Sequence, residues 1–280
     1  MAKRKHEKAS GGETPEAQKA TRKNGHGNAN KNKTQSVTAL RLALLANGYL
    51  PLPAKGKAVH LDDWTNIAVT AEMIQAWPQG KWASYNNTGI LTRHTPAIDI
   101  DILDEDVAKD LEEFTRGFFN GKGQLLYRIG QPPKRAFLFR TDRPFAKLVE
   151  KFIAPGRKFI DKDKDGKEKE HEHKLEILCD GQQLVVDGIH PETGKPYTWP
   201  GPAPWDVPAK DLHPLSQGQA QAWLEQATAL LIARGWQRVG KSQTTDHGDE
   251  SGVPLIVQLA SRLWGDPLTL KPIRAVASSI

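Results

Sequence analysis

Residues 97–102, which read AIDIDI, constrain the fold strongly because polar and apolar side chains alternate there. On a β-strand, alternate residues share one face, so Asp99 and Asp101 are expected to point one way and Ile98, Ile100 and Ile102 the other. Two carboxylates on one face repel each other unless a cation lies between them, and Mg²⁺ prefers oxygen ligands of this kind. The alternation predicts a half-buried strand. Its acidic face is interpreted either as a metal-binding face or as a solvated face over an apolar core.

The net charge of the chain lies in its first 34 residues. They hold nine Lys and Arg and three acidic residues, a balance of +6, which equals the net charge of the whole chain. Residues 1–35 contain almost no large apolar side chain, so we expect a disordered basic tail. We interpret this tail as a solubilising arm; a loose, salt-dependent contact with phosphate backbones is the alternative. The remainder is neutral and gives no sign of a basic groove.

Cysteine usage and hydropathy exclude several classes of protein. The single cysteine, Cys179, excludes a disulfide framework and a cysteine-based zinc cluster. The sequence has neither an apolar run of membrane length nor a signal peptide. We therefore expect a cytoplasmic protein that does not bind membranes.

Strands and helices are expected to mix without strict alternation, which favours an α+β fold. Helices are predicted near residues 37–46, 70–77, 103–119 and 217–234, and a turn followed by a helix over 142–153. Strands are predicted near 86–92, 97–102, 124–130, 135–141, 174–178 and 183–186, with a long charged hairpin over 161–173. The chain is divided into a disordered tail (1–35), one domain (36–212), a C-terminal amphipathic helix (213–240), and a linker with a partial helical unit (241–280).

Two motif matches lack the context that their chemistry needs. Gly235 to Ser242 fits a phosphate-binding loop, but a helix precedes it and a polar linker follows, instead of strand and helix. Residues 161–172 fit a calcium loop, but Glu168 stands at a normally apolar position and Asp165-Gly166 favours a hairpin turn. We reject both.

A third pattern stays open. His171 and His173 would share a strand face and could bind a metal ion, although no third ligand is evident and two solvated histidines are the alternative.

Four segments occur together in a fixed order and carry a family resemblance. They read GYLPLPAKGKAVHLDDW, NNTGILT followed by AIDIDI, LYRIGQPPKRAFLFRT, and KLEIL followed by GQQLVVDGIHPETGKPYTW. The set resembles the primase-polymerase domain of the archaeo-eukaryotic primase superfamily, in the form found at the N-terminus of phage and plasmid replication proteins. The resemblance covers about residues 40–200. It implies a mixed sheet with flanking helices.

The resemblance also implies an activity and its residues. Asp99, Asp101 and Glu176 would bind Mg²⁺ or Mn²⁺ and catalyse nucleotidyl transfer from NTP or dNTP to a primer or initiating nucleotide on single-stranded DNA. Glu176 lies in LEIL, where Leu175 and Ile177 take the opposite face, so a strand geometry is plausible. An exposed strand acid beside a basic partner is the alternative for Glu176.

One segment departs from the family pattern. The second motif of the family usually reads Ser-x-His, and its histidine contacts the nucleotide phosphates, whereas Pro133-Lys134-Arg135 stands here. Lys134 and Arg135 both suit phosphate, and one or the other is predicted to do this work. Arg140 and His190 are further nucleotide-binding candidates, although His190 could instead order its turn, and Lys147 is a secondary candidate.

Two other functions are considered. A replication module could bind nucleotide or nucleic acid with weak or no catalysis, and a nuclease could use the same acids. A replicative helicase, acting in trans or within a longer form of the chain, is an implied partner. An enzyme would need the three acids around shared metal positions with a basic wall beside them, whereas a binding module would need only the wall.

Overall fold

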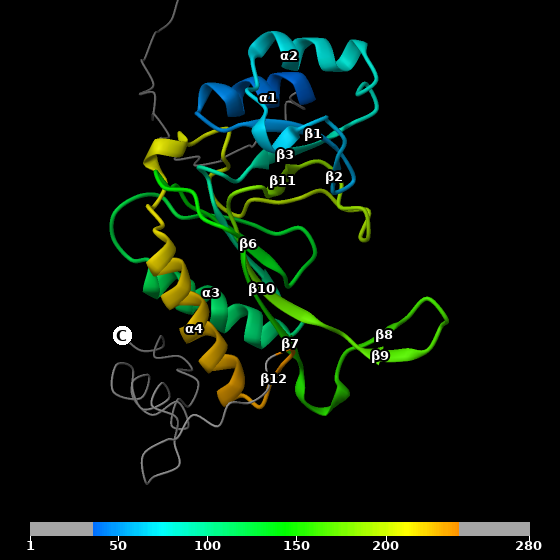
Figure 1. Cartoon of the computed structure of the whole chain (residues 1–280), viewed down its shortest axis with the longest axis vertical. Helices are drawn as coiled ribbons and strands as arrows, with labels where there is room; N and C mark the ends of the chain where they lie inside the picture. The colour runs from blue at the N-terminus through cyan, green and yellow to red at the C-terminus, as the bar shows by residue number, and fades with distance from the viewer. Residues whose placement is uncertain (1–35, 241–280) are drawn as a thin grey trace, which may run out of the picture. The chain divides into compact units, whose positions relative to one another are not determined.

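The computed structural model describes residues 36–240; the expected basic tail and the expected C-terminal unit lie outside these residues. The fold is α+β, as predicted, and its named strands pair antiparallel in two sheets and one separate hairpin (Figure 1). The larger sheet has the order β12(Gln237–Arg238)-β7(Leu148–Ile153)-β10(His173–Leu178)-β4(Ala97–Asp101)-β6(Arg135–Leu138)-β5(Leu126–Arg128). The smaller sheet has the order β11(Gln183–Asp187)-β3(Asn87–Leu91)-β1(Pro51–Lys55)-β2(Ala58–Val59).

Four α-helices accompany these sheets, and each begins at a side-chain cap. The helices are α1(Val37–Ala46), α2(Ala71–Ala76), α3(Glu105–Phe118) and α4(Gln217–Ala233). The capping side chains belong to Ser36, Thr70, Asp104 and Ser216, and each accepts a backbone N–H of the first turn. Because the first N–H groups of a helix have no partner within it, these caps fix where the helices start.

Helices α3 and α4 cover one face of the larger sheet. The core on this face contains Ile98, Ile100 and Ile102 from the β4 region, all fully buried, together with residues of both helices. Trp223 of α4 donates its indole N–H to the hydroxyl of Thr115 in α3, at 3.2 Å. The two helices are thus joined to each other as well as to the sheet.

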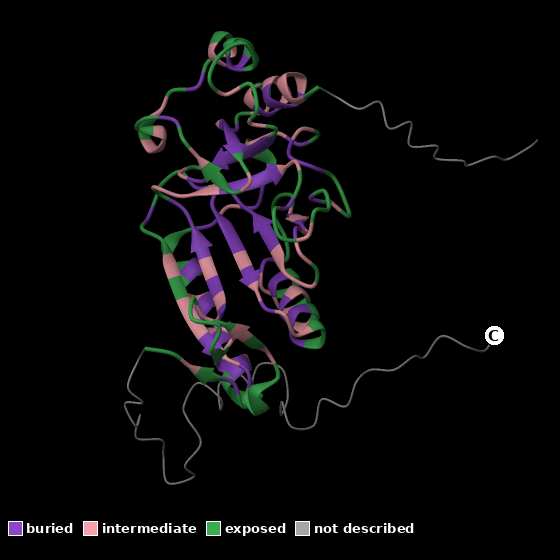
Figure 2. Cartoon of the chain, turned by 90° about the vertical axis from the view of Figure 1, so that its right-hand side faces the viewer, coloured by how far each residue is buried: buried purple, intermediate pink, exposed green. Residues whose placement is uncertain are grey.

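The other face of the larger sheet is only partly covered. A second core joins α1 and the smaller sheet to the Ala97 end of β4, with Leu138 and Leu178 from the flanking strands. Helix α2 belongs to a third core that includes Leu52 of β1 and Leu91 of β3. Asp99 and Asp101, farther along β4, are half-buried. Figure 2 shows strands on which buried and intermediate residues follow one another in bands.

Two neighbouring chain segments pass from one sheet to the other. The chain leaves β3 and enters β4, and β10 leads in the same way into β11. At this crossing the Thr92 hydroxyl donates to the carbonyl of Cys179 at 2.7 Å, and Arg93 forms an ion pair with Asp180 at 2.7 Å. The crossing therefore fixes β4, which carries Asp99 and Asp101, beside β10, which carries Glu176.

The predicted helix over 142–153 is wrong. Residues 148–153 form strand β7, which pairs with β10 and places Leu148, Glu150 and Phe152 opposite Ile177, Leu175 and His173. The sequence LVEKFI has two apolar, two polar and two apolar residues and shows neither period clearly, so pairing with a buried neighbour decides between strand and helix in so short a run.

The charged hairpin is confirmed. β8(Ile160–Lys162) pairs with β9(Glu168–Glu170), and the carboxylate of Asp163 accepts the N–H groups of Asp165 and Lys167 in the turn. Strands stand where a calcium loop would have helices. Of the Gly235–Ser242 string, the described part follows α4 and runs into β12, which is not the context of a phosphate-binding loop. Among residues 36–240, no helix is long and apolar enough to cross a membrane.

Candidate active site

Three acidic side chains gather on the uncovered part of the larger sheet. Asp99 and Asp101 lie on β4, and Glu176 of β10 is the register partner of Asp99. Side chains of directly paired residues on antiparallel strands lie on one face with Cβ atoms about 4.5–5.5 Å apart. The isoleucines of β4 and Leu175 and Ile177 of β10 are fully buried on the opposite face. The alternation predicted for both strands is confirmed.

The electrostatics of Asp99 reflect this arrangement. The pKa of Asp99 is raised to about 6, mainly by burial, with further upward contributions from Asp101 and Glu176. The positive charges of Arg128 and Lys134 oppose the shift. A carboxylate in such a place favours a nearby cation.

Two lysines form ion pairs with two of the acids. The ammonium group of Lys134 lies 2.7 Å from a carboxylate oxygen of Asp101, and that of Lys147 lies 2.6 Å from one of Glu176. Lys134 stands in the turn before β6, where its N–H donates to the carbonyl of Gln131, and Lys147 directly precedes β7. Since β6 flanks β4 and β7 flanks β10, the lysines approach the acids from opposite sides.

Arg128 is a site residue that the sequence analysis missed. It lies on β5 in the same cross-strand row as Ala136 and Asp99, is buried, and interacts electrostatically with Asp99. Its guanidinium lies over the ring of Tyr197, 4.6 Å from the centroid, and donates a hydrogen bond to the carbonyl of Val185. The sequence offered one signal for this residue, a charged side chain inside the short strand LYR. Its position beside Asp99 depends on the register of β5, β6 and β4.

His190 lies on the same side of the sheet. Its ring packs edge-on against Tyr197 with centroids 5.4 Å apart, and the backbone N–H of His190 donates to the carbonyl of Lys195. Burial lowers its pKa, with additional contributions from the positive charges of Lys57, Arg128 and Lys134. Nδ1 of this buried ring has no hydrogen-bond partner within residues 36–240. The ring therefore retains a polar atom for a ligand.

The structure does not bring Arg135 to the acids. Arg135 is the register partner of Ile100, so it faces α3, where its guanidinium forms an ion pair with Glu112. The residue that faces the acids from β6 is Ala136, opposite Asp99.

Arg140 lies beyond the Ala97 end of β4 and is likewise not gathered with the acids. It donates to the carbonyl of Leu212 at 3.1 Å and lies 3.8 Å from the carboxylate of Asp142.

The two histidines of the H-x-H pattern lie with their ring centroids 4.6 Å apart. His171 Nδ1 is 2.9 Å from a carboxylate oxygen of Asp161, whereas His173 accepts the N–H of Leu103 and is fully buried on the helix-covered face. Within the described residues, no group of three or more His, Cys, Asp or Glu side chains is arranged to hold a metal ion. Across residues 36–240, this pair of histidines therefore has no third side chain with which to bind a metal ion.

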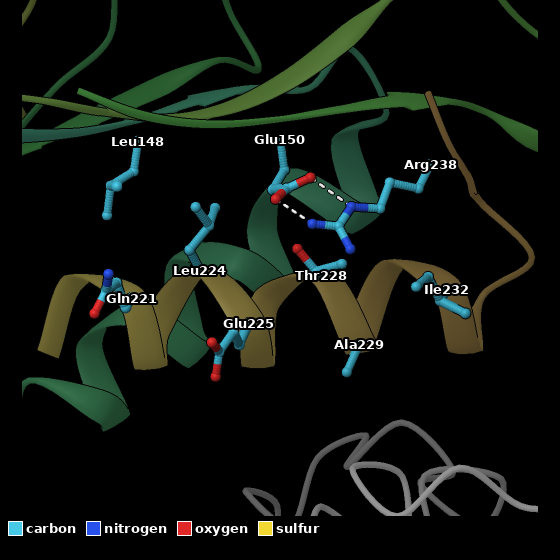
Figure 3. Close-up of a pocket in the computed structure, with 9 residues that line it drawn as sticks. All are labelled: Leu148, Glu150, Gln221, Leu224, Glu225, Thr228, Ala229, Ile232 and Arg238. Atoms are coloured by element: carbon cyan, nitrogen blue, oxygen red, sulfur yellow. Dashed lines mark hydrogen bonds and ion pairs between the residues drawn. The ribbon is translucent and has the colours of Figure 1, made fainter. Parts of the chain in front are cut away.

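A pocket of about 390 Å³ lies on the other side of the sheet. Figure 3 shows it between β7 and α4, lined by Leu148, Glu150 and Leu224 and bordered by the ion pair between Glu150 and Arg238. Leu148 and Glu150 point to the helix-covered face, whereas Glu176 points to the opposite face. The pocket is therefore separate from the acids.

Comparison with family models identifies the chain. The model described as bifunctional DNA primase/polymerase, N-terminal (Prim-Pol), matches residues 39–217, well over half of the chain and all three acids. The chain belongs to the Prim-Pol family. Membership implies DNA primase/polymerase activity, as the resemblance predicted. No curated protein matches the chain.

Prim-Pol proteins are typically metal-dependent, and the donor set of this one fits a hard divalent cation. Three carboxylates on neighbouring strands would supply oxygen ligands, and positive charges surround them. In the described part of the Prim-Pol chain the carboxylates do not converge as a ligand group, and two of them hold lysine ammonium groups instead. Metal binding would require these flexible lysines to turn away and the carboxylates to converge.

Proposed function

We propose that this Prim-Pol domain transfers a nucleotidyl group from an NTP or dNTP to a primer or initiating nucleotide on a single-stranded DNA template. The observation that supports this most strongly is the register of β4 and β10, which pairs Glu176 with Asp99 and leaves Asp101 on the same face. Asp99, Asp101 and Glu176 would hold Mg²⁺ or Mn²⁺. Such ions, when bound, activate the attacking oxygen and neutralise charge on the phosphates.

The surrounding residues would bind and orient the nucleotide. Lys134 would contact the phosphates, because its ammonium group already lies among the acids. His190 would donate or accept a hydrogen bond through Nδ1, and Arg128 would hold Asp99 and Tyr197 in place. As the 3′-oxygen attacks the α-phosphate, the bond to the leaving pyrophosphate breaks, and cationic side chains stabilise the charge that develops there.

We place this reaction in the cytoplasm, in phage- or plasmid-type replication, with a replicative helicase as partner in trans or in a longer form of the chain. Arg135 and Arg140 stay weaker nucleotide-binding candidates, since each is engaged away from the acids.

One observation favours the second candidate, a replication module that binds nucleotide or nucleic acid with weak or no catalysis. The residue of β6 that faces Asp99 is Ala136, whose methyl group can neither donate nor accept a hydrogen bond. A nuclease is less well supported, because His173, a candidate water activator, is buried on the opposite face.

Primer extension on a single-stranded template with Mg²⁺ or Mn²⁺ separates the candidates. The wild type should extend, and Asp99→Asn, Asp101→Asn and Glu176→Gln should each lose at least about a hundredfold in rate, the order expected for loss of a metal ligand. Glu172→Gln is the matched control, since Glu172 pairs with Lys151 just before β10. A wild-type protein that binds nucleotide and DNA but never extends would favour the binding module.

A further inference from the structure

The ion pairs of Lys134 and Lys147 have a consequence for ligand binding that rests on the proposed function. Both lysines are partly shielded, with side chains 20% and 33% exposed, and the carboxylates they contact are 28% and 16% exposed. Charges shielded to this extent interact more strongly than fully exposed ones. The pairs therefore stabilise an acid cluster that would otherwise repel itself.

A divalent cation and these ammonium groups compete for the same oxygens. Each ammonium nitrogen lies 2.6–2.7 Å from a carboxylate oxygen, so it occupies the side from which a metal ion would approach that oxygen. A metal ion that arrives alone must break both ion pairs, and the two lysines then repel it at close range.

A metal ion that arrives with a nucleoside triphosphate meets a different situation. Each displaced ammonium group finds anionic phosphate oxygens beside the acids, and a lysine with its flexible four-carbon stem can turn to them without movement of the backbone. The other cationic side chain beside the acids, Arg128, has less freedom, because it is buried with its guanidinium over the ring of Tyr197. Lys134 and Lys147 come from opposite sides of the acidic strands, so together they can reach both ends of a phosphate chain.

We propose that Lys134 and Lys147 are resident counter-ions of the acid cluster, displaced by a metal-bound nucleoside triphosphate, whose phosphates they then bind. Metal and nucleotide binding are consequently coupled: each ligand binds weakly alone and strengthens the other. Such coupling is reciprocal, and a change of roughly 5–150-fold is typical.

The test is a titration of the full chain with Mn²⁺, in which electron paramagnetic resonance measures the concentration of the free ion. It is done without nucleotide and with a non-hydrolysable α,β-imido dATP. The wild type should bind Mn²⁺ weakly alone and at least about fivefold more tightly with the nucleotide analogue. Lys134→Met, Lys147→Met and the double variant should bind Mn²⁺ alone more tightly than wild type, and the nucleotide analogue should strengthen their binding less.

Two controls assign each outcome. Lys81→Met removes one positive charge from a lysine that pairs with Asp62 and should leave Mn²⁺ binding unchanged. Asp99→Asn and Asp101→Asn should abolish it, and melting curves check that every variant folds. If the acid variants bind Mn²⁺ like wild type, the metal site of the proposed function is wrong. If only the acid variants lose Mn²⁺ and the lysine variants bind it no more tightly than wild type, the counter-ion proposal alone is overturned.

Discussion

Gly130 lies just after β5, where its backbone approaches two rings of the site. A Cβ atom at this position would lie 2.6 Å from the ring of Tyr197 and 3.2 Å from that of His190. Tyr197 is buried and packs under Arg128, so the ring cannot move without disturbing the guanidinium beside Asp99. A glycine here lets the Tyr197 and His190 rings pack close to the backbone that follows Arg128.

Gly130→Ala is therefore expected to destabilise the protein by about 1–3 kcal/mol, the range for overpacking, and to weaken nucleotide binding. Gly117→Ala is the matched control: position 117 is within α3 with open space around it, so alanine should stabilise by about 0.5–1 kcal/mol. Thermal melts and a nucleotide titration measure both effects. A Gly130→Ala protein with wild-type stability and affinity would contradict this account of the packing.

His173 predicts a pH dependence of stability. Its pKa is lowered to about 4, chiefly by burial and next by the charge of His171, whereas an unfolded histidine titrates near 6.5. Between these values the unfolded chain binds a proton that the native state refuses, so this group favours unfolding as pH falls. The stability lost from pH 7 to pH 4 is about 3 kcal/mol.

Urea unfolding of wild type and His173→Asn, compared from pH 7 to pH 4, isolates this contribution. Asp99, whose pKa is raised to about 6, acts in the opposite sense over part of this range, and it is common to both proteins. The asparagine oxygen can still accept the N–H of Leu103. Parallel stability curves for the two proteins would rule out the assignment to His173.

At the scale of elements, α4 provides a test of how the helical layer is anchored. Ser216 and Gln219 form a capping box: the serine hydroxyl accepts the Gln219 N–H at 3.2 Å, and the glutamine oxygen accepts the Ser216 N–H at 3.0 Å. Ser216→Ala should cost about 1 kcal/mol in the free energy of unfolding, and Ser216→Asp should restore most of it, since aspartate is an equally good cap. Equal stability of the alanine and aspartate variants would contradict a capping role.

Elements also show what sequence could and could not predict. The alternation around Asp99 and Glu176 predicted both acidic strands, because each has one fully apolar face. It could not decide between Lys134 and Arg135: adjacent strand residues point to opposite faces, and only the pairing with β4 assigns Arg135 to α3. The position of Arg128 beside Asp99 follows only from the register of β5, β6 and β4 together. The strand conformation of β7 follows only from its pairing with β10. Pairings between distant segments carry this information.

At the scale of the whole domain, the two sheets position one row of charged side chains that are half-buried or buried. The crossing from β3 to β4 and from β10 to β11 fixes the acids beside each other, while α1 and the smaller sheet cover only the Ala97 end. The helices on the opposite face bury the isoleucines of β4 and leave its carboxylates to a ligand. The proposed function thus requires that metal and nucleotide meet at Asp99, Asp101 and Glu176.

The measurement that tests this claim most directly is anomalous X-ray scattering at the manganese edge from crystals of the full chain grown with Mn²⁺ and α,β-imido dATP. We expect an anomalous peak within about 2.0–2.4 Å of carboxylate oxygens of Asp99, Asp101 and Glu176, as for a small divalent ion on oxygen ligands, with the triphosphate beside it. Bound nucleotide without manganese at these carboxylates, or manganese held only elsewhere, would contradict the account.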